Sequence, residues 1–551
     1  MDEQDKIDRR RFVAGTLGAA SALGFGSMLS PPPATAAPTP HATGAPMTPP
    51  RSPPVKFTDP FHTGFYAPLR FEADLHDCEV EGIIPDDLDG SFYRTCADRR
   101  YPQRLAADIP YNADGMMDMF RFRGGHVDFR TRYIRTPRYL AERKARRSLF
   151  GVYRNKYTND PSVAGVSMNT GNTTPIVHAG KLFALKESNL PMLMDPHTLR
   201  TVGEHDFGGR LTASTFTAHP KIDPRTGEMI AFAYEARGDL TDDLAVIFFD
   251  RHGQLTREVW FKAPVVSMMH DFMITEKHVI LPTTGMVTSR ERLLRGENHW
   301  AYDPRTPAWV AILPRDGEAK DVRWFKGPPD RAMLVHATNA RTEGNKVILD
   351  APVARGNFNP QFPNVDGSPY DHEARRNTVR RWIFDLASGD EGWEEEILFE
   401  GIKPTSFSRM DDRYITQPFR WSFNIVSDPE LPFDEARAGV SRAGLWNAWY
   451  RFDHHTGRVE KCTAGLTHSL LEPQFVPRHA DAPEGDGYVI GVANDHAAGR
   501  SELVIVDAQR FSEGPIGRVL LPFRLHMQVH GWWVPSTELP FDFDADPDYP
   551  G

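Results

Sequence analysis

Residues 245–253 read Ala245-Val-Ile-Phe-Phe-Asp250-Arg-His-Gly253. The first part of this stretch is rich in β-branched and aromatic residues, which is typical of a strand. Asp250 then opens a turn, because its side chain can accept hydrogen bonds from the backbone that follows, and Gly253 suits a position with positive φ. The stretch therefore predicts a β-strand that leads directly into a hairpin turn.

The same turn chemistry recurs along the chain. It is found at Asp195-Pro-His-Thr198, Asp223-Pro-Arg-Thr-Gly227, Asp385-Leu-Ala-Ser-Gly389 and Asp453-His-His-Thr-Gly457. Helical signals are sparse, and the best of them covers residues 138–150. Repeated antiparallel hairpins indicate an all-β protein, which is either a β-propeller or a large sandwich. Nothing interrupts the hairpin series, so residues 57–551 are expected to form one domain.

The composition excludes several classes of function. With 551 residues, of which 40% are hydrophobic, the chain can bury a large core. Its formal net charge of -10 argues against a nucleic-acid partner, because phosphate recognition needs a basic surface. The cysteines Cys78, Cys96 and Cys462 are far apart, so neither a disulfide framework nor a thiolate metal site is predicted.

The N-terminal residues have the layout of a twin-arginine export signal. Arg9-Arg-Arg-Phe12 precedes a moderately apolar run over residues 13–29, and small residues follow at Ala34-Thr-Ala36. We expect residues 1–36 to be this signal, residues 37–56 to be a disordered Pro/Ala-rich linker, and the protein to be periplasmic. A disordered basic tail or a membrane anchor is the alternative, although glycines and serines weaken the run as a spanning helix, and no later stretch is long enough to be one.

Four of the 21 histidines stand out because each lies beside a strand-like run. They occur in Thr217-Ala-His219-Pro, Met268-Met-His270-Asp, Leu334-Val-His336-Ala and Gln528-Val-His530-Gly. They are too far apart for a local zinc loop, but a closed propeller brings distant strands to one axis. Imidazole ligands without thiolates suit iron, copper or zinc. From the residues alone, a single histidine is more often a surface residue or a satisfied core residue than a metal ligand.

Several other motifs are spread over the chain: Gly82-Ile-Ile-Pro-Asp-Asp-Leu-Asp-Gly-Ser-Phe-Tyr-Arg94, Asp114-Gly-Met116, residues 218–227, His270-Asp-Phe272, Glu472-Pro-Gln-Phe-Val-Pro-Arg478 and His530-Gly531. In this order they resemble the carotenoid cleavage oxygenase family, from about Phe65 to Pro535. The resemblance implies a seven-bladed β-propeller with a small helix-and-loop cap, which forms an apolar tunnel over the axial metal site. It also implies O2-dependent cleavage of a carbon-carbon double bond, and it leaves a homodimer open.

The resemblance also assigns the metal site. The four histidines above would bind Fe(2+), one ion per subunit, and the carboxylates that accept their other ring N–H groups map to Glu187 and Glu472. The family has a third glutamate in a Glu-Phe-Pro-Arg motif, where this chain has Ser406-Phe-Ser-Arg409. Ser406 is therefore expected to accept an N–H or to hold a water, and to weaken iron retention by about 10- to 100-fold.

Residues 132–136, 142–155 and 185–187 resemble the lignostilbene- and isoeugenol-cleaving branch of that family, and residues 521–525 and 530–535 resemble its isoeugenol-cleaving members in particular. In this branch a tyrosine and a lysine bind the substrate's 4-hydroxyl, and they fall on Tyr153 and Lys186, while Tyr111 falls on an aromatic tunnel position. Without the resemblance, Lys186 reads as a solvated strand lysine and Tyr153 as a packed core residue. Lys186 and Glu187 are adjacent, so both can face the site only if their strand bends or ends there.

The expected activity is that of an iron(II)-dependent dioxygenase, which splits the side-chain double bond of a phenolic alkene with O2 to give aldehydes. Stilbenes and phenylpropenes such as isoeugenol are the expected substrates. The alternatives are cleavage of an apocarotenoid on the same scaffold and a non-catalytic secreted propeller that binds a ligand.

Overall fold

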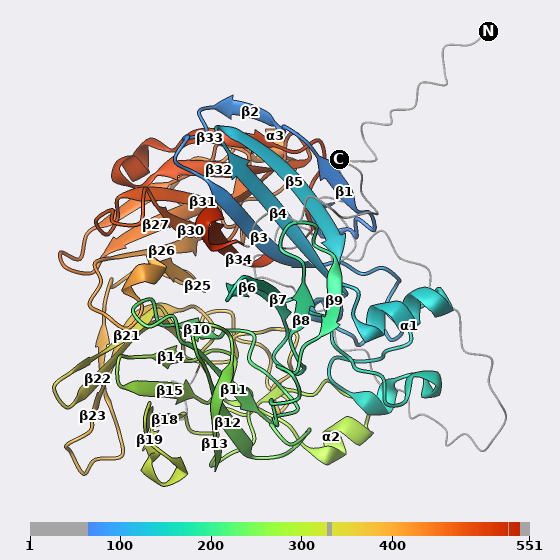
Figure 1. Cartoon of the computed structure of the whole chain (residues 1–551), viewed down its shortest axis with the longest axis vertical. Coiled ribbons are helices and arrows are strands. Elements are labelled where there is room, and N and C mark those ends of the chain that lie inside the picture. The colour runs from blue at the N-terminus through green and yellow to red at the C-terminus, as the bar shows by residue number, and fades with distance from the viewer. Residues whose placement is uncertain (1–63, 328–332, 527, 540–551) are drawn as a thin grey trace.

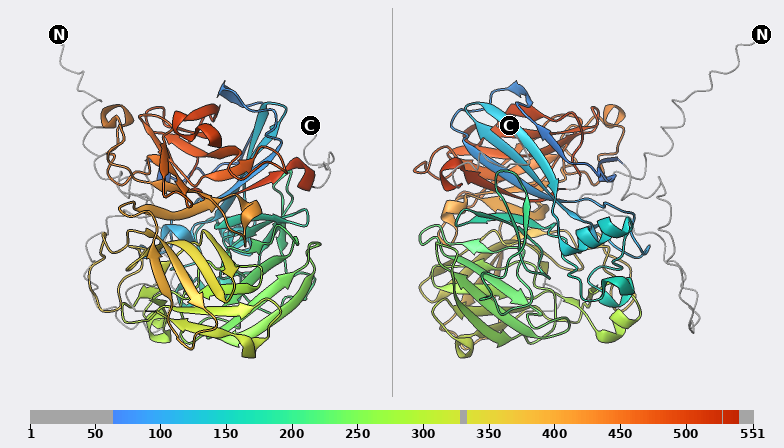
Figure 2. Two further views of the ribbon diagram at one scale, coloured as in Figure 1. Left: turned by 90° about the vertical axis from the view of Figure 1, so that its left-hand side faces the viewer. Right: turned by 45° about the vertical axis from the view of Figure 1, so that its right-hand side comes forward.

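The computed structural model describes residues 64–327, 333–526 and 528–539. Among these residues it contains seven sheets of four to six antiparallel strands, together with one two-stranded sheet. The sheets surround a central region where β6, β10, β25 and β34 come together (Figures 1 and 2). The all-β, seven-bladed propeller predicted from the sequence is thus confirmed. The expected signal and linker, residues 1–56, lie outside the described residues.

The blades follow one another in chain order. The first blade consists of β6 (Thr174–His178), β7 (Lys181–Leu185), β8 (Met192–Met194) and β9 (Thr201–Glu204). The second consists of β10 (Lys221–Ile222), β11 (Met229–Tyr234), β12 (Asp243–Phe249) and β13 (Leu255–Lys262). The third consists of β14 (Met273–Ile274), β15 (His278–Pro282), β18 (Trp309–Pro314) and β19 (Arg323–Lys326), with β16 (Met286–Val287) and β17 (Ala301–Tyr302) forming the small extra sheet. The fourth consists of β20 (Met333–Leu334), β21 (Asn339–Glu343), β22 (Lys346–Ala354), β23 (Thr378–Asp385) and β24 (Glu394–Ile397). The fifth consists of β25 (Pro404–Met410), β26 (Trp421–Val426), β27 (Ala448–Asp453) and β28 (Val459–Cys462).

The last two blades combine strands from both ends of the described chain. One contains β2 (Glu79–Gly82), β29 (His468–Leu470), β30 (Gln474–Pro477), β31 (Gly487–Asp495), β32 (Arg500–Asp507) and β33 (Pro515–Leu520). The other contains β1 (Ala73–Leu75), β3 (Gly90–Ala97), β4 (Gly115–Arg123), β5 (His126–Tyr133) and β34 (Gln528–Pro535). The pairs β2–β33 and β3–β34 therefore join N-terminal to C-terminal strands in two blades, which closes the ring.

The five aspartate turns are hairpin turns, as the sequence predicts. Asp250 accepts hydrogen bonds from the backbone N–H groups of His252 and Gln254 at 2.9 Å, and Gly253 has a φ of 76°. The other four aspartates each accept a bond from the N–H two residues further on. Each of the five turns joins two paired antiparallel strands. Local side-chain chemistry thus sets the outer corners of the blades.

Helices are few and short in the part of the chain that the structure describes. The α-helices of the described residues are α1 (Pro137–Ala145), α2 (Arg290–Leu294) and α3 (Glu435–Ala438). Thr136 caps α1 by accepting a bond from the Tyr139 N–H at 3.1 Å, so helix formation within residues 138–150 is confirmed as far as Ala145. The buried Arg138 of α1 donates to the side chain and the carbonyl of Asn112 at 2.6 and 2.8 Å. α1 thereby fixes the β3–β4 loop, which carries Tyr111.

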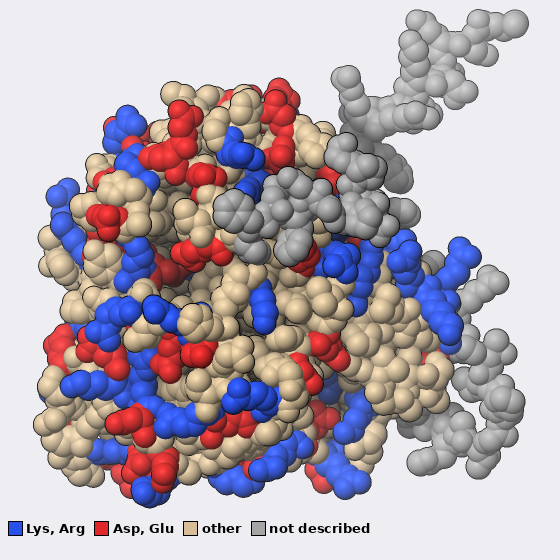
Figure 3. Space-filling view, in the orientation of Figure 1, with Lys and Arg blue, Asp and Glu red and all other residues tan. Residues whose placement is uncertain are grey.

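The surface carries both signs of charge. Acidic and basic side chains are interspersed on the face drawn in Figure 3, and basic ones gather over α1. On this face acidic side chains thus lie between the basic ones. In the part of the chain that the structure describes, no helix has both the length and the apolar character needed to cross a membrane.

Candidate metal centre and its cavity

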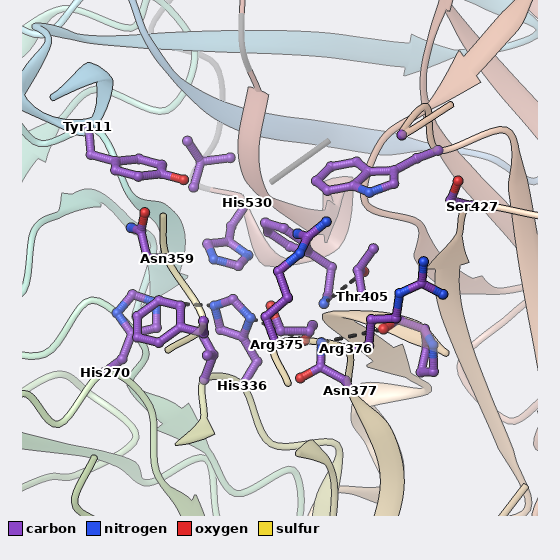
Figure 4. Close-up of a pocket in the computed structure, with 18 of the residues that line it drawn as sticks. Tyr111, His270, His336, Asn359, Arg375, Arg376, Asn377, Thr405, Ser427 and His530 are labelled. Atoms are coloured by element: carbon purple, nitrogen blue, oxygen red, sulfur yellow. Dashed lines mark hydrogen bonds between the residues drawn. The ribbon is translucent and has the colours of Figure 1, made fainter. Parts of the chain in front are cut away.

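Four histidine side chains from four different blades meet in the centre of the ring. His219 precedes β10, His270 precedes β14, His336 precedes β21 and His530 lies in β34. One nitrogen of each ring lies within 4.8 Å of the corresponding nitrogens of the others. His270 Nε2 is 3.1 Å from the Nε2 atoms of both His219 and His336. The structure thus brings together the four histidines selected from the sequence, three of which are labelled in Figure 4.

In three of the four histidines, Nδ1 forms a hydrogen bond to an oxygen atom. His270 Nδ1 lies 2.8 Å from Glu187, and His530 Nδ1 lies 2.8 Å from Glu472. His336 Nδ1 donates to the backbone carbonyl of Ser406 at 3.1 Å. These contacts orient Nε2 of each ring towards the common centre, as partners of metal-binding histidines usually do.

The contact at Ser406 differs from the one expected, because the main chain rather than the side chain accepts the His336 proton. Ser406 lies in β25 where the register with β26 is interrupted between Pro404 and Ser408. An interruption of this kind leaves backbone groups out of the strand ladder, so the carbonyl can serve another donor. A neutral carbonyl therefore stands in the place expected for a third carboxylate.

Burial lowers the pKa of three of the four histidines, which favours their neutral form. Burial lowers the pKa of His219 well below its ordinary value, and the other three imidazoles lower it further. Burial, His530 and His270 have the same effect on the pKa of His336. For His530 burial also lowers the pKa, although the Glu472 carboxylate opposes it. Neutral imidazoles are the form that binds metals, so the donor set fits a divalent transition metal.

Asp271, the residue after His270, connects the histidine-bearing segments. Its carboxylate lies 2.7 Å from Lys221 Nζ and accepts the backbone N–H of Ala337 at 2.9 Å. Lys221 comes two residues after His219, and Ala337 comes directly after His336. Because Asp271 is buried, one carboxylate fixes three of the four segments relative to one another.

Gly531 allows His530 to approach its carboxylate partner. The Gly531 N–H donates to Glu472 at 2.8 Å, so Glu472 accepts from two consecutive residues. A Cβ at this position would lie 2.7 Å from the Phe92 ring and 3.2 Å from Arg94. The structure thus gives a steric reason for the glycine in the His530-Gly motif. The buried Arg94 in turn donates to the Glu472 carbonyl at 2.9 Å.

A cavity of about 600 Å³ lies against the histidine cluster, and its lining includes His270, His336 and His530. This size is typical of small-molecule sites. Aromatic rings form much of its wall: Tyr111, Tyr153, Phe358, Phe362, Phe407 and Trp446. The tunnel residue expected at Tyr111 therefore does line a cavity.

Lys186 and Glu187 both line this cavity because β7 ends at Leu185, just before them. Lys186 Nζ lies over the Tyr153 ring, 5.0 Å from its centroid, and Tyr153 Oη is 3.5 Å from Glu187. Burial lowers the pKa of Lys186 to about 8, against the opposing effect of Glu187. Burial raises the pKa of Tyr153 well above its ordinary value, and Glu187 raises it further.

Sequence reasoning missed several lining residues. Phe407 packs its ring 5.2 Å from the rings of both His336 and His530, yet the motif containing it was considered only for its missing carboxylate. A group of cations further along the cavity was also missed: Arg375, Arg376, Lys403 and Arg442. These four residues come from three separate loops, so no sequence spacing connects them.

Known proteins resemble this chain over most of its length. The family model of the retinal pigment epithelial membrane protein (RPE65) matches residues 66–535. Lignostilbene-alpha,beta-dioxygenase isozyme III of Sphingomonas paucimobilis is 42% identical over 486 residues, which are 87% of this chain and 97% of that protein. Isoeugenol monooxygenase of Pseudomonas putida is 39% identical over 480 residues, covering 86% and 98% respectively.

Among solved structures, the lignostilbene dioxygenase of Pseudomonas brassicacearum matches with a TM-score of 0.83 and 42% identity, over 86% of this chain and 98% of that one. Both the family and the branch expected from the sequence are therefore confirmed as relationships. The chain belongs to the retinal pigment epithelial membrane protein family, which is the family of carotenoid cleavage oxygenases.

Proposed function

We propose that the protein is an iron(II)- and O2-dependent oxygenase that cleaves the side-chain double bond of a 4-hydroxyphenyl alkene to two carbonyl products. One observation carries this proposal: Lys186 and Tyr153 line the same cavity as His270, His336 and His530 of the four-histidine cluster. The names of the relatives, a lignostilbene dioxygenase and an isoeugenol monooxygenase, point to the same chemistry.

The four histidines would hold one Fe(2+), with Glu187, Glu472 and the Ser406 carbonyl fixing three of the rings. Iron(II) bound there supplies the binding and activation of O2 next to the alkene. An all-nitrogen donor set also suits copper or zinc, so the choice of iron rests on the oxygenase names of the relatives.

Lys186 and Tyr153 would act on the substrate's phenol. In its neutral form Lys186 accepts the phenolic proton, and the Tyr153 hydroxyl then donates to the resulting phenolate oxygen. The phenolate pushes electron density through the ring into the side-chain alkene, which makes the alkene more reactive towards an oxidant. The aromatic wall of the cavity orients the planar substrate and excludes water from it.

The test is a substrate panel with iron quantification. Protein with its metal content measured is given isoeugenol, 4-hydroxystilbene and an apocarotenal, and O2 uptake and product masses are recorded. We expect O2 uptake and aldehydes from the two phenols. Turnover of the apocarotenal alone would favour polyene cleavage, and iron-free protein that consumes no O2 with any compound would favour a binding protein.

We also propose export by the twin-arginine route, supported by Arg9-Arg10-Arg11-Phe12 and the small residues that end at Ala36. Replacement of Arg9, Arg10 and Arg11 by lysine is expected to keep the protein in the cytoplasmic fraction of cells. Unchanged distribution of this variant would contradict the proposal.

A further inference from the structure

The cavity has two chemically different ends. One end contains Tyr111, Tyr153 and Lys186, beside the histidine cluster. In Figure 4 Tyr111 lies on one side of the labelled histidines, whereas Arg376 and Ser427 lie on the other. This second end, called the cationic end, contains Arg375 and Arg376. The side chain of Asn377, next to Arg376, donates to the Pro404 carbonyl at 3.3 Å, which brings the segment of Lys403 to this end. Arg442 lines the same cavity and contacts Leu431, four residues after Ser427, so Lys403 and Arg442 are counted with the cationic end.

Carboxylates are scarce among the residues that line the cavity. Among the described lining residues, Glu187 is the one carboxylate, and it is bound to His270. Arg376 pairs with Glu373 at 3.2 Å, but both side chains are more than half exposed, so solvent screens this pair. Burial lowers the pKa of Arg375, and repulsion from the Arg376 guanidinium adds to this effect, while Tyr370 and Glu373 oppose it.

Lys403 and Arg442 are the least neutralised members. In the described residues, no ion pair joins either side chain to a carboxylate. Arg442 donates from its side chain to the Leu431 carbonyl at 3.3 Å, while Glu435 takes its backbone N–H at 2.8 Å. Lys403 is exposed and Arg442 is half-buried, so both can reach a ligand that extends from the interior.

We propose that the cationic end binds a carboxylate on the far end of an elongated phenolic substrate, for example 4′-carboxy-4-hydroxystilbene. This inference rests on the proposed function, since it places the substrate's phenol at Lys186 and its alkene beside the histidines. A carboxylate accepts charge-assisted hydrogen bonds from guanidinium and ammonium groups, and a cationic mouth also attracts anionic substrates from solution.

The experiment compares 4′-carboxy-4-hydroxystilbene with its methyl ester, which has the same shape without the charge. We expect the wild-type kcat/KM to favour the acid, and this ratio to fall about tenfold in Lys403→Gln and further in Lys403→Gln/Arg442→Gln. Raised salt should lower kcat/KM for the acid and leave that for the ester unchanged. Lys320→Gln is the matched control, because Lys320 is exposed and pairs with the exposed Glu318 away from the cavity. Its ratio should equal that of the wild type.

Equal kcat/KM values for acid and ester in the wild type, or a ratio unchanged in both variants, would overturn the inference and leave the proposed function standing. Failure of the proposed function is recognised separately, because then neither stilbene is cleaved. In that case a binding experiment still tests whether the cationic end prefers a carboxylate. It compares the non-cleavable 4′-carboxy-4-hydroxybibenzyl with its methyl ester, and binding is measured by quenching of tryptophan fluorescence. Tighter binding of the acid that disappears in Lys403→Gln supports the subsite, and equal binding contradicts it.

Discussion

The carboxylate of Asp271 lies 2.7 Å from the ammonium of Lys221, with both side chains largely withdrawn from solvent. The same carboxylate accepts the N–H of Ala337, so it connects the segments that carry His219, His270 and His336. The geometry of the histidine cluster thus depends on a residue that does not belong to it.

Asp271→Ala should therefore disturb the metal site and the fold together. It leaves the Lys221 charge and the Ala337 N–H without their acceptor, which we expect to cost about 3–5 kcal/mol of unfolding free energy. Denaturant unfolding and metal content by mass spectrometry measure both effects. Asp242→Ala is the control, because Asp242 pairs with Lys262 at 2.6 Å on the surface, and its loss should cost under about 1 kcal/mol. Equal costs for the two variants would contradict this role of Asp271.

Glu472 and Ser406 should respond differently to truncation. Glu472→Ala removes the carboxylate that accepts from His530 and Gly531, so metal affinity should fall about 10- to 100-fold. Ser406→Ala keeps the carbonyl that accepts from His336, and metal affinity should stay within about twofold of the wild type. Competition with a chelator measures both affinities. A large loss in Ser406→Ala would show that the hydroxyl, rather than the carbonyl, supports the site.

Gly531→Ala tests the packing beside His530. The added methyl group would lie 2.7 Å from the Phe92 ring, so either the ring or the strand must move. We expect a loss of about 1–3 kcal/mol in unfolding free energy, with a weaker metal site because His530 is adjacent. Thermal unfolding without iron measures the loss of stability, and the same measurement with added iron measures the weaker metal binding. Wild-type stability in this variant would mean that β34 tolerates a side chain here.

The pKa of Lys186 predicts a pH dependence. Burial lowers this pKa to about 8, so the side chain is an ammonium below pH 8 and a neutral amine, able to accept the phenolic proton, above it. For 4-hydroxystilbene, kcat/KM should rise up to about pH 8 and then level off, whereas 4-methoxystilbene should show no such rise. Lys186→Met should abolish the rise and slow the phenol far more than an apocarotenal. A profile that persists in Lys186→Met would assign the titration to another group.

The features of the fold that depend on interactions between residues close in sequence could be predicted from the sequence. The aspartate turns at Asp223, Asp250 and Asp453 could be predicted because side chain and backbone interact within four residues. The histidines needed the motif resemblance, since their convergence depends on closure of the whole ring. The role of the Ser406 carbonyl as the acceptor for His336 could not be predicted. The carbonyl is available because the strand register is irregular at this point, and no residue type in the sequence indicates that irregularity. The cationic end was missed because Lys403 and Arg442 belong to distant loops that only the fold brings together.

The central claim is that iron held by the four histidines supports O2-dependent cleavage of a phenolic alkene. The most direct test follows O2 consumption and products with 4-hydroxystilbene in wild-type protein of known iron content and in His219→Ala and His530→Ala. We predict that the wild type holds about one iron per subunit and yields 4-hydroxybenzaldehyde and benzaldehyde with uptake of O2, while both variants lose iron and activity. Full iron content in the two variants, or an iron-loaded wild type that consumes no O2 and forms no aldehyde, would contradict the claim.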